Sequence, residues 1–148
     1  MRVLVVSDDE LERRRIVGAM SLVSAEVTEV DDVERMRVLL IEEPGTFDVV
    51  VVDGDLRPRG GYAALYDVRA RAELDGFAVP VSVVVVEREQ DRWLAAWAGA
   101  NAVVFRPVDG FELSRRVREI RHEGLRPYGD RGSDAAQLAE ATRGHQSA

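Results

Sequence analysis

The chain has 148 residues, carries a formal net charge of −7 at pH 7 and contains no cysteine. This length suits one domain with an ordinary core, and the missing thiols exclude disulfides, thiolate metal sites and cysteine nucleophiles. The acidic balance argues against general binding to nucleic acid, and no apolar run approaches the roughly 20 residues of a membrane span. We therefore expect a cytoplasmic protein with neither a nucleic-acid nor a membrane partner.

Short β-branched runs alternate with helix-like segments over the first 122 residues. In chain order, the pattern predicts a strand at 2–6, a helix at 10–22, a strand at 25–30, a helix that Asp31 or Asp32 caps and Pro44 and Gly45 end, a strand at 48–52, a helix at 61–73, a strand at 79–86, a helix at 90–98, a strand at 101–105, and a last helix that Asp109 caps. The spacing also predicts a core-facing stripe in the first helix, made of Leu11, Ile16, Val17 and Met20.

Five nearly continuous apolar strands separated by helices favour a parallel sheet that is covered on both faces. Because crossover connections are right-handed, we expect an α/β fold, a doubly wound three-layer sandwich, over residues 1–122. Residues 123–148 are rich in Gly, Ser, Asp and Ala and only weakly patterned. We expect them to form a flexible tail, with a short helical turn at 134–142.

Acidic residues gather where the strands end. Asp8 and Asp9 follow the first strand, Asp53 and Asp55 end the third, and Arg106 follows the fifth. The carboxyl ends of parallel strands share one edge of a sheet, so these side chains should converge there. Clustered carboxylates need a cation, and an all-oxygen set of ligands suits Mg²⁺. All 20 basic residues of the chain are arginine.

Each acidic residue also has a purely structural interpretation. Asp8 or Asp9, taken alone, more often caps a helix than binds a ligand. Asp55 could begin an Asx-turn into the Arg57-Pro58 loop. The combination with Asp53 favours a shared site for Asp8 and Asp9. For Asp55, the turn is favoured over a carboxylate ligand.

The order of these segments resembles the receiver domains of two-component response regulators, which are CheY-like. RVLVVSDDELERRR resembles their first strand, acidic pair and first helix, and FDVVVVDGDLRPRGG resembles the phospho-acceptor strand and its loop. VPVSVVVV resembles the fourth strand, and AGANAVVFRPVD the fifth strand and its Lys-Pro turn. The resemblance is greatest to atypical stand-alone receivers of high-GC Gram-positive bacteria, which share DG…P.GG and a helix with two tryptophans.

The resemblance implies a role for each strand-end residue. Asp53 would accept a phosphoryl group from a histidine kinase, with Mg²⁺ neutralising charge during the transfer. Asp8 and Asp9 would hold the metal together with Asp53, and Asp55 would offer it a backbone carbonyl. Ser7 is a competing register for the acidic pair, because the strand can be aligned one residue earlier.

Three positions depart from the receiver pattern. Receivers carry a lysine where this chain has Arg106, and arginine is planar, longer and forked. The hydroxyl at the end of the fourth strand, which reports the phosphate, falls on Val85, and the aromatic switch residue of the fifth strand falls on Val103. Ser82 lies too early in its strand to substitute. Arg106 would therefore sense the phosphate alone, or form a standing ion pair with Asp53 in a module that does not depend on phosphorylation.

With no output domain after residue 122, a receiver of this kind would signal through protein contacts and not as an enzyme, apart from hydrolysis of its own phosphoryl group. The resemblance implies a partner face on the fourth helix, fifth strand and fifth helix, including Trp93, Trp97 and Phe111. A homodimer through that face is compatible with the sequence.

Residues 49–57 also resemble motifs of two other classes of protein. VVVVDGDLR also resembles the DxD motif of haloacid-dehalogenase-type phosphohydrolases, but such enzymes usually carry the motif on the first strand. A P-loop nucleotide site is excluded, because its lysine does not occur in this chain.

Overall fold

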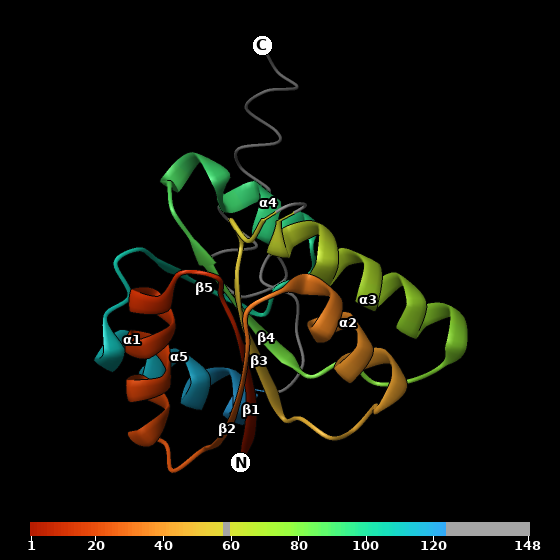
Figure 1. Ribbon diagram of the computed structural model, residues 1–148, viewed down its shortest axis with the longest axis horizontal. Helices are drawn as coiled ribbons and strands as arrows, with labels where there is room; N and C mark the ends of the chain where they lie inside the picture. Colours follow the sequence, from red (N-terminus) through yellow and green to blue (C-terminus); the bar gives the residue numbers. More distant parts are fainter. Residues whose placement is uncertain (58–59, 124–148) are drawn as a thin grey trace.

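The computed structural model describes residues 1–57 and 60–123, which form one parallel sheet with helices on both faces (Figure 1). The strand order is β2-β1-β3-β4-β5, so β3 lies in the centre. The strands are β1 (Arg2–Val6), β2 (Glu26–Val30), β3 (Val49–Asp53), β4 (Val81–Val86) and β5 (Ala102–Phe105). The predicted doubly wound α/β sandwich is confirmed, and the first and third strands are neighbours in it.

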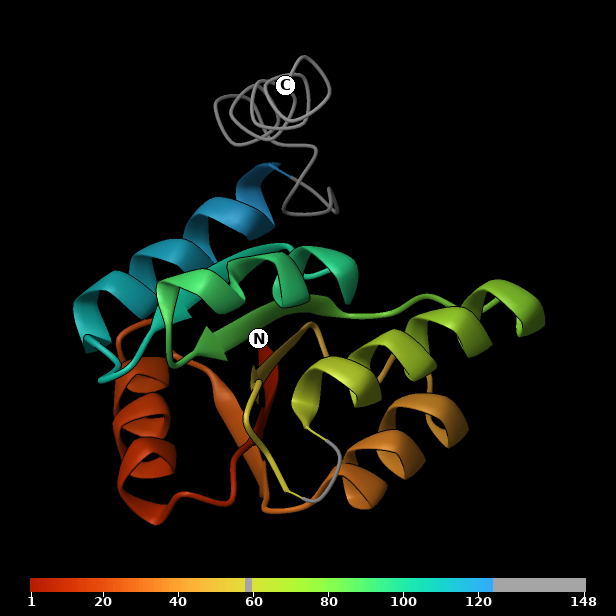
Figure 2. The same ribbon diagram turned by 90° about the horizontal axis from the view of Figure 1, so that it is seen from above.

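The helices divide between the two faces of the sheet. They are α1 (Glu10–Ser21), α2 (Val33–Glu42), α3 (Gly61–Asp75), α4 (Arg92–Trp97) and α5 (Gly110–Glu123), with a 3-10 turn, η1 (Glu89–Asp91), before α4. Core residues of α1 and α5 pack with one face of the sheet. Core residues of α2, α3 and α4 pack with the other, as Figures 1 and 2 show.

The valines of β3 explain its central position. All five residues of β3 are buried, and successive side chains point to opposite faces of the sheet. Val49 and Val51 accordingly join the core under α1 and α5, while Val50 and Val52 join the core under α2, α3 and α4. A strand without an exposed face has to be apolar on both sides, which is why this run shows no alternation.

The helix starts follow the predicted capping residues. Asp32 accepts the N–H of Arg35 and caps α2, which decides between the two predicted aspartates. Asp109 accepts the N–H of Glu112 at the start of α5. Asp9 accepts the N–H of Glu12 and caps α1.

One core prediction in α1 was wrong. Leu11 is exposed, and the buried residue of this turn is Glu12. Glu12 lies towards the loop between β5 and α5, where it accepts a hydrogen bond.

The predicted tail falls outside the described residues from residue 124 onward, and so does the helical turn predicted at 134–142. None of the described helices has the length and apolarity of a membrane span.

Candidate functional site

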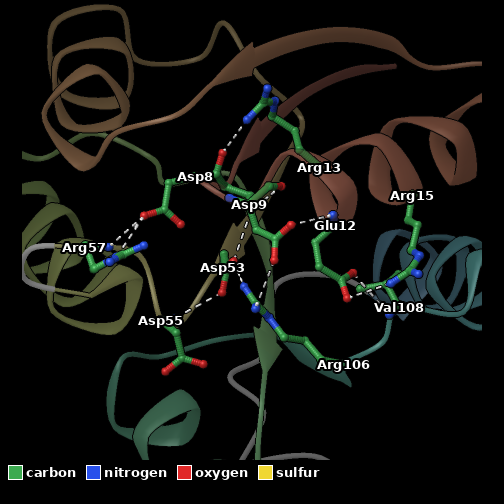
Figure 3. Close-up of polar contacts among 11 residues, drawn as sticks. Asp8, Asp9, Glu12, Arg13, Arg15, Asp53, Asp55, Arg57, Arg106 and Val108 are labelled. Carbon is green, nitrogen blue, oxygen red and sulfur yellow. Dashed lines mark hydrogen bonds and ion pairs between the residues drawn. The ribbon is translucent and has the colours of Figure 1, made fainter.

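The predicted cluster lies at the carboxyl edge of the sheet, where β1, β3 and β5 end (Figure 3). Val6 of β1 pairs with Val52 of β3, so the next residues along the two strands, Ser7 and Asp53, lie side by side. Arg106 follows β5 and donates its backbone N–H to Val86 of β4. The Arg106-Pro107 peptide bond is cis.

Asp53 is fully buried and has partners on both carboxylate oxygens. The Ser7 hydroxyl donates to Oδ2 at 3.0 Å, and the Arg106 guanidinium forms an ion pair with the same oxygen. The backbone N–H of Asp55 donates to Oδ1 at 3.1 Å. A buried carboxylate is stable only when it is paired and hydrogen-bonded, and Asp53 is both.

Arg106 contacts a second carboxylate as well. Its Nη1 lies 3.6 Å from Oδ2 of Asp9, while its other terminal nitrogen pairs with Asp53. The guanidinium therefore lies between two of the predicted carboxylates (Figure 3). A planar, forked cation can bridge two acids in this way, whereas the compact ammonium of lysine acts as a single point of charge.

Asp8 belongs to the same rim but not to this cluster. Its Oδ2 accepts the backbone N–H of Arg57 at 3.4 Å and lies 3.8 Å from the Nε of that residue. Figure 3 shows the Asp8 side chain directed towards Arg57 and away from Asp53. The structure thus brings Ser7, Asp9, Asp53 and Arg106 into contact, with Asp8 beside them.

The arrangement of the carboxylates bears on the predicted magnesium site. In the described part of the chain, no three His, Cys, Asp or Glu side chains are grouped so that they could hold a metal ion. The position between Asp9 and Asp53 is taken by a guanidinium, and the residue in register with Asp53 is Ser7, which carries no charge. As arranged, these residues do not form a magnesium centre, and magnesium binding stays a prediction.

Asp55 is exposed, whereas the residues on either side of it are buried. Its side chain is exposed at the surface, and only its backbone N–H contacts Asp53. Burial raises the pKa of the Asp55 carboxyl, and the nearby charges of Glu87 and Asp91 raise it further, while Arg88 opposes them. The Asx-type contact at this point is therefore made by Asp53, whose carboxylate accepts the N–H two residues on. The Asx-turn predicted to begin at Asp55 stays a prediction.

Glycines allow the loop after β3 to lie close to its neighbours. A side-chain carbon at Gly61 would collide with the carbonyl oxygen of Asp53, so α3 can begin directly against the strand end only with glycine there. A side-chain carbon at Gly54 would collide with the ring of Tyr62. The Tyr62 hydroxyl is buried without a hydrogen-bond partner, and burial raises its pKa, followed by the effect of Asp55.

The two degenerate switch positions are apolar and buried. Val85 is in register with Asp53 on β4 and belongs to the core under α1 and α5. Val103 belongs to the opposite core. Ser82 bonds Asn101, and it pairs with Val50, three residues before Asp53 on β3. The described residues of β4 therefore place no hydroxyl beside Asp53.

The predicted partner residues are exposed, at 63% for Trp93, 48% for Trp97 and 78% for Phe111. Trp97 stacks on Tyr66 of α3, with ring centroids 4.3 Å apart. This pair lines a groove of about 480 Å³ between α3 and α4. The aromatic surface of α4 therefore continues onto α3, an extension that the sequence did not indicate.

The sequence reasoning missed Glu12. It is 5% exposed and accepts the backbone N–H of Val108, two residues after Arg106, at 3.3 Å. The only sequence signal was its place three residues after the capping Asp9, since acidic residues at that position commonly face back towards the helix start.

One parallel sheet in the order β2-β1-β3-β4-β5, with helices on both faces, has the architecture of the CheY-like fold. Solved structures share this fold. The chain matches the receiver domain of the yeast regulator Ssk1, crystallised with the histidine phosphotransfer protein Ypd1, with a TM-score of 0.72 and 18% identity, over 80% of this chain and 87% of that chain. It also matches the receiver domain of NarL from Mycobacterium tuberculosis with a TM-score of 0.66 and 23% identity, over 80% and 93%.

Sequence comparison agrees with the fold. The chain is 29% identical over 124 residues to a response regulatory protein of Mycobacterium tuberculosis, which covers 81% of this chain and 90% of the relative. It is 26% identical over 121 residues to the chemotaxis protein CheY-3 of Vibrio cholerae, covering 81% and 91%. No protein-family profile matches the chain. Its homologues are response regulators with receiver domains, and this protein is a receiver-domain relative of those regulators.

Proposed function

We propose that the protein is an atypical single-domain response regulator in which the ion pair between Arg106 and Asp53 holds the resting state. That contact is the observation that carries the proposal, because it joins the acceptor position of a receiver to the turn after β5. A change at Asp53 alters a buried charge, and the guanidinium has to respond to it. The response would reach other proteins through surface contacts.

Phosphorylation of Asp53 is the event that would break the pair. One carboxylate oxygen would attack the phosphorus of a phosphohistidine or a small phosphodonor, forming a new P–O bond as the bond to the donor's leaving group breaks. That oxygen has to leave its present partners first. Arg106 could then pair with the phosphoryl oxygens, since a guanidinium binds phosphate as well as carboxylate.

A second candidate is a module that never needs phosphorylation. Asp53 is fully buried, and both of its oxygens are occupied. The residue beside it on β4 is Val85, which provides no hydroxyl to report a phosphate. In this case the ion pair is permanent, and the domain presents one constant surface.

Treatment with acetyl phosphate, with and without magnesium, separates the two candidates. Intact-mass analysis should show one added phosphoryl group on the wild-type protein and none on Asp53→Asn. An Asp67→Asn variant, which removes a surface carboxylate paired with Arg37, serves as the control for the general loss of one negative charge. If no phosphoryl group is added at any magnesium concentration, the result favours the second candidate, the module that does not need phosphorylation. A parallel assay with an aryl phosphate tests the phosphohydrolase alternative, for which we expect no turnover.

A histidine kinase or a histidine phosphotransfer protein is the proposed partner. Support comes from the receiver domains it resembles, one of which was crystallised with a phosphotransfer protein and another of which is part of a hybrid histidine kinase. We further propose a cytoplasmic location, where such kinases present their phosphohistidine. The proposed output surface is the exposed aromatic face of α4, including Trp93 and Trp97, and self-association through it is measurable by sedimentation.

A further inference from the structure

The first turn of α1 contains a buried carboxylate that the proposed chemistry does not use. Glu12 accepts the N–H of Val108 on Oε2 at 3.3 Å and the guanidinium of Arg15 on Oε1 at 3.1 Å. Residues 12 and 108 are 96 positions apart in the chain. A carboxylate is costly to bury, so a contact of this kind normally fixes the geometry of the segments that it joins.

The segment that Glu12 holds is the turn that carries Arg106. Val108 follows Arg106 by two residues, so its N–H lies at the far side of the same turn (Figure 3). Asp9, the capping residue of α1, contacts the guanidinium itself. Helix α1 therefore contacts this turn twice, once at the side chain and once at the backbone.

The guanidinium of Arg106 depends on that support. Its Nε is buried without a hydrogen-bond partner, and its two terminal nitrogens contact Asp53 and Asp9. Because the Nε does not anchor the group, the position of the backbone turn decides whether the terminal nitrogens reach Asp53.

We propose that Glu12 is a positioning residue for Arg106, which holds the turn after β5 so that the guanidinium spans Asp53 and Asp9. This inference rests on the ion pair that the proposed function also uses. It adds that α1 shares in setting the state of Asp53, through a contact that does not involve β4 or the switch positions.

A double-mutant cycle on the unphosphorylated protein tests the proposal. Glu12→Ala, Asp53→Asn and the double variant are compared with wild type by thermal unfolding in EDTA. Glu12 contacts Arg15 and Val108, and Asp53 contacts other residues, so independent roles would give additive losses of Tm. If Glu12 positions Arg106, the Tm loss caused by Asp53→Asn should fall by at least half in the Glu12→Ala background. Additive losses would overturn the proposal.

Two further variants control the cycle. Glu10→Ala removes a carboxylate from the same turn of α1, where Glu10 forms an exposed pair with Arg14, and it should be additive with Asp53→Asn. Glu12→Gln keeps an acceptor for the Val108 N–H and should restore the full effect of Asp53→Asn. Should Glu12→Ala fail to fold, Glu12→Asp, which is one methylene too short to keep its contact, carries the same cycle.

The assay measures unfolding and not phosphoryl transfer. A negative result therefore removes the positioning role without affecting the proposed function. Conversely, coupling between Glu12 and Asp53 would stand even if no phosphoryl group is ever accepted.

Discussion

Replacement of Asp53 by asparagine tests the charge balance of the site directly. The Asp53 side chain is 1% exposed and the Arg106 side chain 20%. Removing one partner of a buried ion pair typically costs about 3–5 kcal/mol. Arg106 keeps Asp9 as a partner and is partly exposed, so we expect a smaller loss, about 2 kcal/mol. For a domain of this size, that corresponds to a Tm decrease of about 8 °C.

The sign of the change is the informative quantity. If uncompensated repulsion among the carboxylates dominated, asparagine would relieve it and raise the Tm. Thermal unfolding followed by circular dichroism in EDTA distinguishes the two outcomes. Asp67→Asn is the matched control, because Asp67 pairs with Arg37 at the surface and its loss should change stability by less than about 1 kcal/mol. A higher Tm for Asp53→Asn would refute the view that Arg106 is the cation of this site.

Three further predictions concern the surroundings of the acceptor. Burial, Glu87 and Asp91 raise the pKa of Asp55 above its ordinary 3.8, so its ionised form destabilises the folded state at neutral pH. Asp55→Asn should raise the Tm at pH 7, and this gain should disappear below pH 3.8, where both states are protonated. Tyr62→Phe removes a buried hydroxyl that has no partner and should increase the free energy of unfolding in urea by about 1 kcal/mol, whereas a decrease would reveal a partner for that hydroxyl. The ammonium of a lysine cannot span two carboxylates, so Arg106→Lys should lower the Tm but increase phosphoryl uptake from acetyl phosphate. Unchanged uptake would show that the guanidinium does not restrict phosphorylation of Asp53.

Arginines balance the negative charge of this site, because the chain contains no lysine. Asp8 is paired with Arg57, and Asp9 and Asp53 share Arg106. Asp8, Asp9 and Asp53 thus each have a guanidinium partner. The residue beside Asp53 on β1 is Ser7, which is uncharged. An acidic residue at that position would add one more negative charge to the site.

Much of the fold followed from the sequence because the signals are local and repeated. Runs such as 49–52 have no polar face, so they need cover on both sides, and the helices between them supply it. The rule that the carboxyl ends of parallel strands share an edge predicted that the side chains at the strand ends converge, namely those of Asp8, Asp9, Asp53, Asp55 and Arg106. The structure brings Asp9, Asp53 and Arg106 into contact. It leaves the side chains of Asp8 and Asp55 outside that cluster. The alignment with the receiver pattern also predicted that Val85 and Val103 occupy its two switch positions.

The tertiary structure decided what the strand pattern left open. The pairing of Val6 with Val52 places Ser7 beside Asp53, and it leaves Asp9 free to cap α1. Continuous apolar runs do not determine that register, because it depends on contacts between strands that lie far apart in the chain.

By itself, the sequence determined the layers of the fold, the sheet edge that carries the site and the position of Arg106 at that edge. Only the packed structure determined that Arg106 bridges Asp53 and Asp9, that Asp8 turns to Arg57 and that Glu12 is buried. The physical reason is the same for all three. The direction of a polar side chain depends on partners supplied by other elements, and those partners meet only when the helices and strands have packed.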